Sequence, residues 1–124
     1  MNDSIAAYAR AKALQPPQGQ TRVLRMNGDT DDSIVLEARG DAFFVYRIHP
    51  LPFPTELQLL RAMTRSDARH GHGVRVGLRG SGHDAALFMV IRLGEESPDP
   101  ARIDRALDTL KRWQAAWTSA CDTF

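Results

Sequence analysis

The chain has 124 residues, 43% of them hydrophobic and 25% charged, which predicts one globular domain over residues 1–124. Sixteen basic and fifteen acidic side chains give a net charge of +1, too balanced for binding to a nucleic-acid backbone by charge alone. A single cysteine excludes an internal disulfide framework and a cysteine-based metal centre. The longest apolar run, Ala85 to Ile91, is far short of the about 20 residues of a membrane helix. The N-terminal residues lack a signal peptide's apolar block, so we expect a cytoplasmic protein.

The first half of the chain predicts a short helix followed by a three-stranded meander. Apolar residues recur at helical spacing from Asp3 to Leu14, and Pro16-Pro17 closes that segment. Alternating patterns then predict strands over Thr21–Met26, Ser33–Arg39 and Ala42–His49. The connections are short, which favours antiparallel neighbours, because parallel strands need a crossover of about a dozen residues.

The second half predicts a helix, a hairpin and a long final helix. Prolines at positions 50, 52 and 54 end the third strand, and Thr55 can cap a helix over Glu56–Thr64. Two strands, Val74–Arg79 and Ala85–Leu93, flank a glycine-rich turn, and the second is apolar on both faces, as a central strand is. Asp99 and Pro100 begin the final helix. The predicted class is α+β with the order α-β-β-β-α-β-β-α.

The histidines raise the question of a metal site. His70 and His72 lie two residues apart, and Asp67, His83 or Asp84 would have to supply a third ligand. Their spacing matches no recognised zinc pattern, and the segment reads as a glycine-bearing solvated loop. We therefore expect no metal and no cofactor.

Other candidate chemistry is equally weak. Gly80 and Gly82 precede a strand rather than a helix, which predicts a hairpin turn and not a phosphate cradle. Cys121 has no basic neighbour in sequence to lower the pKa of its thiol. The acidic cluster Asp29, Asp31 and Asp32 lacks the spacing of a calcium loop and is interpreted as a solvated hairpin tip. The sequence thus predicts no enzyme.

Apolar residues on both faces of the predicted sheet are the main functional signal. Phe43 and Phe44 are adjacent on one strand, and Phe88 and Met89 are adjacent on another. One layer of helices cannot cover both faces of a five-stranded sheet, and uncovered apolar patches usually mark an interface. The alternative is that the first and third helices cover one face and the second covers part of the other.

The element order, the length and the lack of a catalytic constellation resemble the class I type III secretion chaperones from Ser4 to Ala120. The resemblance implies a cytoplasmic homodimer that holds the N-terminal region of a secreted effector in a non-globular form and delivers it to the secretion apparatus. It implies a dimer contact through Leu57, Leu60 and Met63. The residues implied to bind the partner lie on the first three strands and the final helix, namely Val23, Leu24, Met26, Ile34, Leu36, Phe44, Tyr46, Trp113 and Trp117.

Charge sets this chain apart from that family, whose members are usually acidic. Fourteen of its sixteen basic residues are arginine. We expect Arg22, Arg25 and Arg47 on exposed faces, where they can pair with carboxylates of an acidic effector.

Two other functions stay open. A small ligand-binding or regulatory α+β domain would enclose a pocket between sheet and last helix and bury its aromatic residues, Phe43, Phe44, Trp113 and Trp117. An enzyme would use the region of His70, His72 and His83.

Overall fold

The computed structural model describes residues 3–12, 23–28, 31–66, 73–95 and 97–122. Its helices and strands follow the predicted order, and their boundaries coincide with the predicted ones or differ by a few residues. They are α1 (Asp3–Ala11), β1 (Val23–Asn27), β2 (Ser33–Arg39), β3 (Ala42–Pro50), α2 (Glu56–Arg65), β4 (Arg75–Arg79), β5 (Ala86–Leu93) and α3 (Pro100–Asp122), with a short 3-10 turn, η1 (Gly82–Asp84), between β4 and β5.

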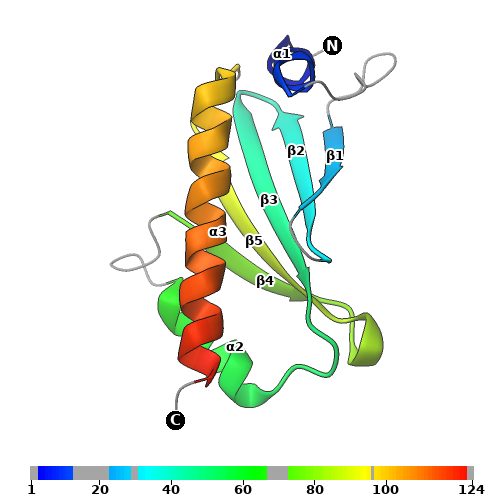
Figure 1. Cartoon of the computed structure of the whole chain (residues 1–124), viewed down its shortest axis with the longest axis vertical. Coiled ribbons are helices and arrows are strands. Elements are labelled where there is room, and N and C mark those ends of the chain that lie inside the picture. Colours follow the sequence, from blue (N-terminus) through cyan, green and yellow to red (C-terminus); the bar gives the residue numbers. More distant parts are fainter. Residues whose placement is uncertain (1–2, 13–22, 29–30, 67–72, 96, 123–124) are drawn as a thin grey trace.

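The five strands form one antiparallel sheet in the order β1-β2-β3-β5-β4 (Figure 1). Strand β5 therefore lies inside the sheet between β3 and β4, which confirms the position predicted from its two apolar faces. The edge strands of the described sheet are β1 and β4, each five residues long. The predicted α+β class is confirmed.

One face of the sheet carries the helices. Helix α3 runs along β3 and β5, and α1 packs near β2 and the N-terminal part of α3 (Figure 1). Helix α2 packs beside α3 rather than across the opposite face, so the alternative in which it covers that face is wrong. The register aligns Leu36, Val45 and Ile91 across three strands, on the face that meets α3. Together with Ile103 and Leu110 of α3 they belong to the buried core.

Two backbone carbonyl groups of α2 accept hydrogen bonds from tryptophan side chains of α3. Thr55 is its N-cap, and a capping box with Gln58 satisfies the first amide groups of the helix. The indole nitrogen of Trp113 donates to the carbonyl of Arg65 at 3.2 Å, and that of Trp117 donates to the carbonyl of Gln58 at 3.0 Å. Both rings are buried, so these bonds hold α2 from one end to the other against the last turns of α3.

The connection from β4 to β5 requires glycine. Gly80 has φ +75°, and a Cβ there would lie 2.7 Å from the carbonyl oxygen of Asp84. The amide of Phe53 donates to the carbonyl of Gly82 at 2.9 Å, which ties this connection to the segment that precedes α2. The turn is longer than the predicted tight hairpin because η1 is inserted in it.

Candidate partner-binding surfaces

Helix α2 presents apolar side chains to solvent. Leu60 is 61% exposed and Met63 is 69% exposed, whereas Leu57 is half-buried and Ala62 is buried. The three residues predicted for a dimer contact thus lie on one helix, and two of them are exposed. Large exposed side chains of this kind are costly in water and commonly mark contact surfaces when they cluster.

The sheet face opposite α3 is a second apolar surface, which we call the open face. No helix in the described part of the chain packs on it. Half-buried side chains of β3 and β5 form its centre, namely Phe44, Tyr46, Ile48, Phe88 and Val90. The rings of Phe44 and Tyr46 stack with their centroids 6.2 Å apart. This face is the uncovered apolar surface that the sequence predicts.

Two arginines lie over the rings of the open face. The Arg39 guanidinium carbon is 5.5 Å from the ring centroid of Phe44, and that of Arg79 is 5.3 Å from the ring centroid of Phe88. Glu37 connects to the same group, because its carboxylate pairs with Arg39 at 2.8 Å and accepts from the Tyr46 hydroxyl at 3.3 Å. Burial, then the negative charge of Glu37, raise the pKa of Tyr46, so its hydroxyl stays protonated and able to donate.

The nine predicted partner-binding residues divide between the two faces of the sheet. Four of them lie in the chain's own core, namely Leu24, Leu36, Trp113 and Trp117. Met26 and Ile34 are half-buried and pack against that core. The remaining three, Val23, Phe44 and Tyr46, lie on the open face, as the strand register shows. The open face therefore brings together three of the nine, and the other six belong to the helix side of the sheet.

A buried polar cluster corrects two sequence expectations. Asp32 is 2% exposed and is not part of a solvated hairpin tip, and Arg47 is 6% exposed and does not face a partner. The Arg47 Nη2 atom lies 2.7 Å from Asp32 Oδ2, and His49 Nδ1 lies 2.7 Å from Asp32 Oδ1. Gln114 of α3 accepts from Arg47 Nε at 2.6 Å. Arg47 is buried because side chains of β3 point alternately to the two faces of the sheet. Arg47 therefore lies on the same face as Phe43, which is the face that carries the helices.

The sequence also predicts partner contacts for Arg25 and Arg22. Arg25 is exposed, as expected, and lies on the open face of β1. Arg22 lies outside the described residues.

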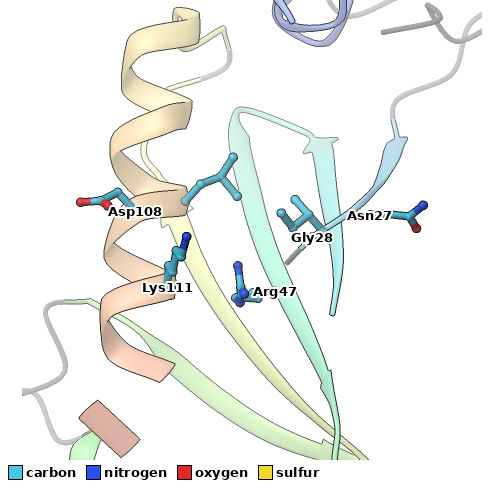
Figure 2. A pocket seen from close by; sticks show the side chains of 7 residues that line it. Asn27, Gly28, Arg47, Asp108 and Lys111 are labelled. Atoms are coloured by element: carbon cyan, nitrogen blue, oxygen red, sulfur yellow. The ribbon is translucent and has the colours of Figure 1, made fainter. Parts of the chain in front are cut away.

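A cavity of about 270 Å³ lies between α3 and the end of the β1–β2 hairpin. Figure 2 shows Lys111 and Asp108 on the helix side, Gly28 on the strand side, and Arg47 between them. None of the four aromatic residues expected around a ligand pocket lines it. Three of those four, Phe43, Trp113 and Trp117, are buried in the core, and Phe44 lies on the open face. The cavity is thus a surface cleft lined by both polar and apolar residues rather than the aromatic pocket of the ligand-binding alternative.

The structure gives little support to metal or thiol chemistry. His70, His72 and Asp67 lie outside the described residues, and His83 is an exposed side chain 3.4 Å from Asp84. Among the residues described, no group of three histidine, cysteine or acidic side chains is placed to hold a metal ion. Burial, then the charge of Asp122, raise the pKa of the Cys121 thiol, which disfavours the reactive thiolate.

None of the described helices is both long and apolar enough to cross a lipid bilayer.

Comparison with known proteins identifies the fold. No protein-family model matches the chain, and no curated protein matches it. Among solved structures it is similar to a chain of the HopA1–SchA chaperone–effector complex, with 14% identity and a TM-score of 0.69, over 93% of this chain and 90% of the other. A chain of the ExoU–SpcU complex from the type III secretion system of Pseudomonas aeruginosa gives 14% identity and a TM-score of 0.65, over 94% and 96%.

A chain of the ExsC–ExsE complex is similar in the same way, with 10% identity and a TM-score of 0.72, over 94% of this chain and 89% of the other. At these identities the likeness concerns the fold, and it extends over nearly the whole chain in all three cases. The chain therefore has the α+β fold of type III secretion chaperones, as the resemblance in sequence pattern predicts.

Proposed function

We propose that this chain is a type III secretion chaperone. In this role it binds the N-terminal region of a cognate effector in the cytoplasm, keeps it soluble and competent for secretion, and delivers it to the secretion apparatus. It acts by binding alone, without catalysis or a cofactor. The main support is the fold, which matches a chain of the HopA1–SchA chaperone–effector complex, a chain of the ExoU–SpcU complex from a type III secretion system and a chain of the ExsC–ExsE complex, each over at least 93% of this chain.

The apolar side chains that stay partly accessible on the open face supply the energy that such binding needs. A client segment that covers side chains such as Phe44 and Phe88 removes apolar area from water on both partners. An interface of about 1,500 Å² is of standard size for a specific complex, even after the cost of ordering a flexible segment. A chaperone of this kind stabilises the client simply because it covers the groups through which the client would aggregate.

We further propose that the chain forms a homodimer through α2. Leu60 and Met63 project from a helix whose position is fixed by two tryptophan hydrogen bonds, so the contact surface is already in place before association. A two-fold interface is isologous, so the same apolar patch on each subunit covers the other. Leu57, which is half-buried within the subunit, completes the contact.

A direct test is co-expression with the products of neighbouring genes. Each candidate is produced as its N-terminal segment and, separately, without that segment, each with and without this chain. We expect one N-terminal segment to be soluble only in the presence of the chain and to elute with it as one species in size-exclusion chromatography. The truncated form of the same candidate serves as control and should not bind. The proposal fails if every segment is equally soluble alone and none elutes with the chain.

A ligand-binding domain is the weaker alternative. The cleft between α3 and the β1–β2 hairpin is lined by Arg47, Asp108 and Lys111 among others, and it lacks the mostly apolar walls typical of small-molecule sites.

A further inference from the structure

Positive charge is concentrated on the open face. Its strand positions carry five exposed arginines and one carboxylate, namely Arg25, Arg39, Arg75, Arg79, Arg92 and Glu37. Their net charge is +4, whereas that of the whole chain is +1, so the remainder of the chain is net acidic. The balanced total therefore conceals a strongly cationic face, whose positive potential attracts anionic ligands.

The arginines of this face lie on both sides of its apolar centre. One row across the sheet begins at Arg25 of β1 and ends at Arg75 of β4, and between them it contains only Val35, Tyr46 and Val90. Neighbouring strands are about 4.8 Å apart, so each of the two arginines lies about 10 Å from the strand that carries Tyr46. An apolar strip thus lies between two arginine margins.

Three aromatic rings lie along this strip. The rings of Phe44 and Tyr46 are stacked with their centroids 6.2 Å apart. Phe88 lies on the neighbouring strand β5, diagonal to Tyr46, and such diagonal neighbours are about 7–8 Å apart. All three residues are half-buried, so packing restricts their rings while part of each side chain stays accessible. Sheet faces that bind RNA stack two or three bases on aromatic side chains arranged in this way.

Two arginines extend the stacking surface. The guanidinium carbon of Arg39 is 5.5 Å from the ring centroid of Phe44, and that of Arg79 is 5.3 Å from the ring centroid of Phe88. A guanidinium plane stacks with a base as an aromatic ring does, and its N–H groups donate to phosphate oxygens. Each pair of arginine and ring thus combines a flat contact for a base with donors for a phosphate.

A glycine leaves space beside one of the rings. Gly77 of β4 is the register partner of Phe88, and a Cβ at this position would meet nothing within 4 Å. Its φ is not positive, so the backbone conformation does not require glycine there. Glycine inside a strand often marks a place where a ligand approaches closely. The space between Arg75 and Arg79 on this strand is therefore open to a planar group.

We propose that the open face binds single-stranded RNA, with bases stacked on Phe44, Tyr46 and Phe88 and with phosphates paired to the arginine margins. The total charge of the chain does not favour such a ligand, but rings and arginines on one face supply the two contacts that single-stranded nucleic acids need. RNA is the abundant single-stranded nucleic acid of the cytoplasm, where we place the chain. The inference goes beyond the chaperone role. RNA and a client segment that covers Phe44 and Phe88 would exclude each other.

Three other occupants fit the face less well. A nucleic-acid duplex keeps its bases stacked inside, so it would use the arginines but not the rings. An acidic peptide supplies carboxylates but no flat groups for the three rings. A second copy of the chain would place arginines against arginines across a two-fold axis, which is repulsive.

The test measures the binding of labelled probes to the full chain by fluorescence anisotropy. The probes are a uridine-rich single-stranded RNA, the corresponding DNA, an RNA duplex of the same length and a glutamate-rich peptide. The variants are Arg75→Glu and Phe88→Leu, which removes a ring but keeps an apolar side chain. Phe44→Leu repeats the ring test at a second position. Arg105→Glu, at an exposed position on α3, is the control that changes net charge equally. Circular dichroism establishes that each variant is folded.

We expect the single-stranded RNA to bind more tightly than the other three probes. Each ring variant should weaken its binding about tenfold, because a base loses its stacking partner. If four phosphates are neutralised, the logarithm of the association constant should fall with that of the salt concentration with a slope of about −3. Arg75→Glu should make this slope shallower by about 0.7, and Arg105→Glu should leave it unchanged.

Any of four results would overturn the inference. They are equal binding of single-stranded RNA and duplex, ring variants that bind the RNA like the wild type, equal salt slopes for Arg75→Glu and Arg105→Glu, and tighter binding of the DNA or the peptide than of the RNA. All of these measurements use the chain without an effector, so failure here is distinct from failure of the chaperone proposal.

Discussion

Arg47 and Asp32 form an ion pair inside the protein, with 2.7 Å between Nη2 and Oδ2 and with the Asp32 side chain fully removed from solvent. The pair joins the residue before β2 to the middle of β3, and Gln114 links it to α3. The amide of Gly28 donates to the carbonyl of Asp32 at 2.8 Å, so the backbone of the same residue closes the β1–β2 connection. This cluster links α3 to the sheet through Gln114.

Removal of one partner from this pair should be strongly destabilising. Asp32→Ala leaves the Arg47 guanidinium buried without its carboxylate, and such changes cost about 3–5 kcal/mol. We expect that loss in the free energy of unfolding measured by urea denaturation. Asp31→Ala, which removes an exposed carboxylate next to it, should change the free energy by less than about 0.5 kcal/mol. Equal effects of the two substitutions would contradict the role of the pair.

The contact between α1 and α3 should depend on pH. Asp104 accepts from the Tyr8 hydroxyl at 2.8 Å and from Lys12 Nζ at 2.7 Å. Burial raises the pKa of Asp104, but the hydrogen bonds from Lys12 and Tyr8 outweigh it and leave the pKa of that carboxyl below its usual value. A depressed pKa in the folded state adds stability above the unfolded-state pKa of about 3.9, and that stability is lost as the pH falls through the folded-state pKa.

Asp104→Asn is the variant that isolates this effect. At pH 7 the wild type should be more stable than Asp104→Asn, by no more than about 1 kcal/mol because the carboxylate is partly exposed. The difference in unfolding free energy should shrink as the pH falls below 4. A difference that stays constant between pH 7 and pH 2 would argue against the ionised carboxylate as its source.

Two glycines with positive φ offer a matched comparison. Gly80 and Gly40 have φ of +75° and +60°, but a Cβ at Gly80 would lie 2.7 Å from the Asp84 carbonyl oxygen, whereas a Cβ at Gly40 would meet nothing within 4 Å. Gly40→Ala should therefore cost only the conformational penalty of about 1–2 kcal/mol. Gly80→Ala should cost clearly more in thermal or urea unfolding, since the turn must also shift. A smaller loss at Gly80 than at Gly40 would mean that the turn adapts freely.

A charge on the exposed side of α2 should abolish the proposed dimer. Leu60→Asp places a carboxylate at the centre of the apolar contact, where it cannot be paired. We expect monomers by size-exclusion chromatography with light scattering, while the fold is retained because Leu60 is 61% exposed in the subunit. Ala115→Asp, at an exposed position on α3, is the control and should leave the dimer intact. A Leu60→Asp protein that still forms dimers would exclude α2 as the contact.

The secondary structure could be predicted because each element has a clear local pattern. Strand β2 alternates from Ser33 to Arg39, and its observed boundaries are the predicted ones. Helix α2 extends one residue beyond its prediction, to Arg65, after the predicted cap at Thr55. The central position of β5 also follows from its composition, since only an inner strand buries apolar residues on both faces.

The assignment of faces could not be predicted in the same way. In β3 both sets of alternating side chains are apolar, so the pattern does not tell which set meets a helix. The burial of Asp32 depends on contacts with Arg47 and with Gln114, which are distant in the sequence. The arginine margins of the open face likewise arise from the order of the strands, which brings Arg75 of β4 into one row with Arg25 of β1.

The two tryptophan hydrogen bonds to α2 have a practical consequence. Trp113 and Trp117 are the only tryptophans in the sequence, and both indole groups bind the backbone of that one helix. Intrinsic tryptophan fluorescence of the unlabelled protein therefore reports on the contact between α2 and the core around the end of α3. Loosening of α2 would shift the emission to longer wavelengths, so assembly and dissociation at this site can be followed optically without an attached dye.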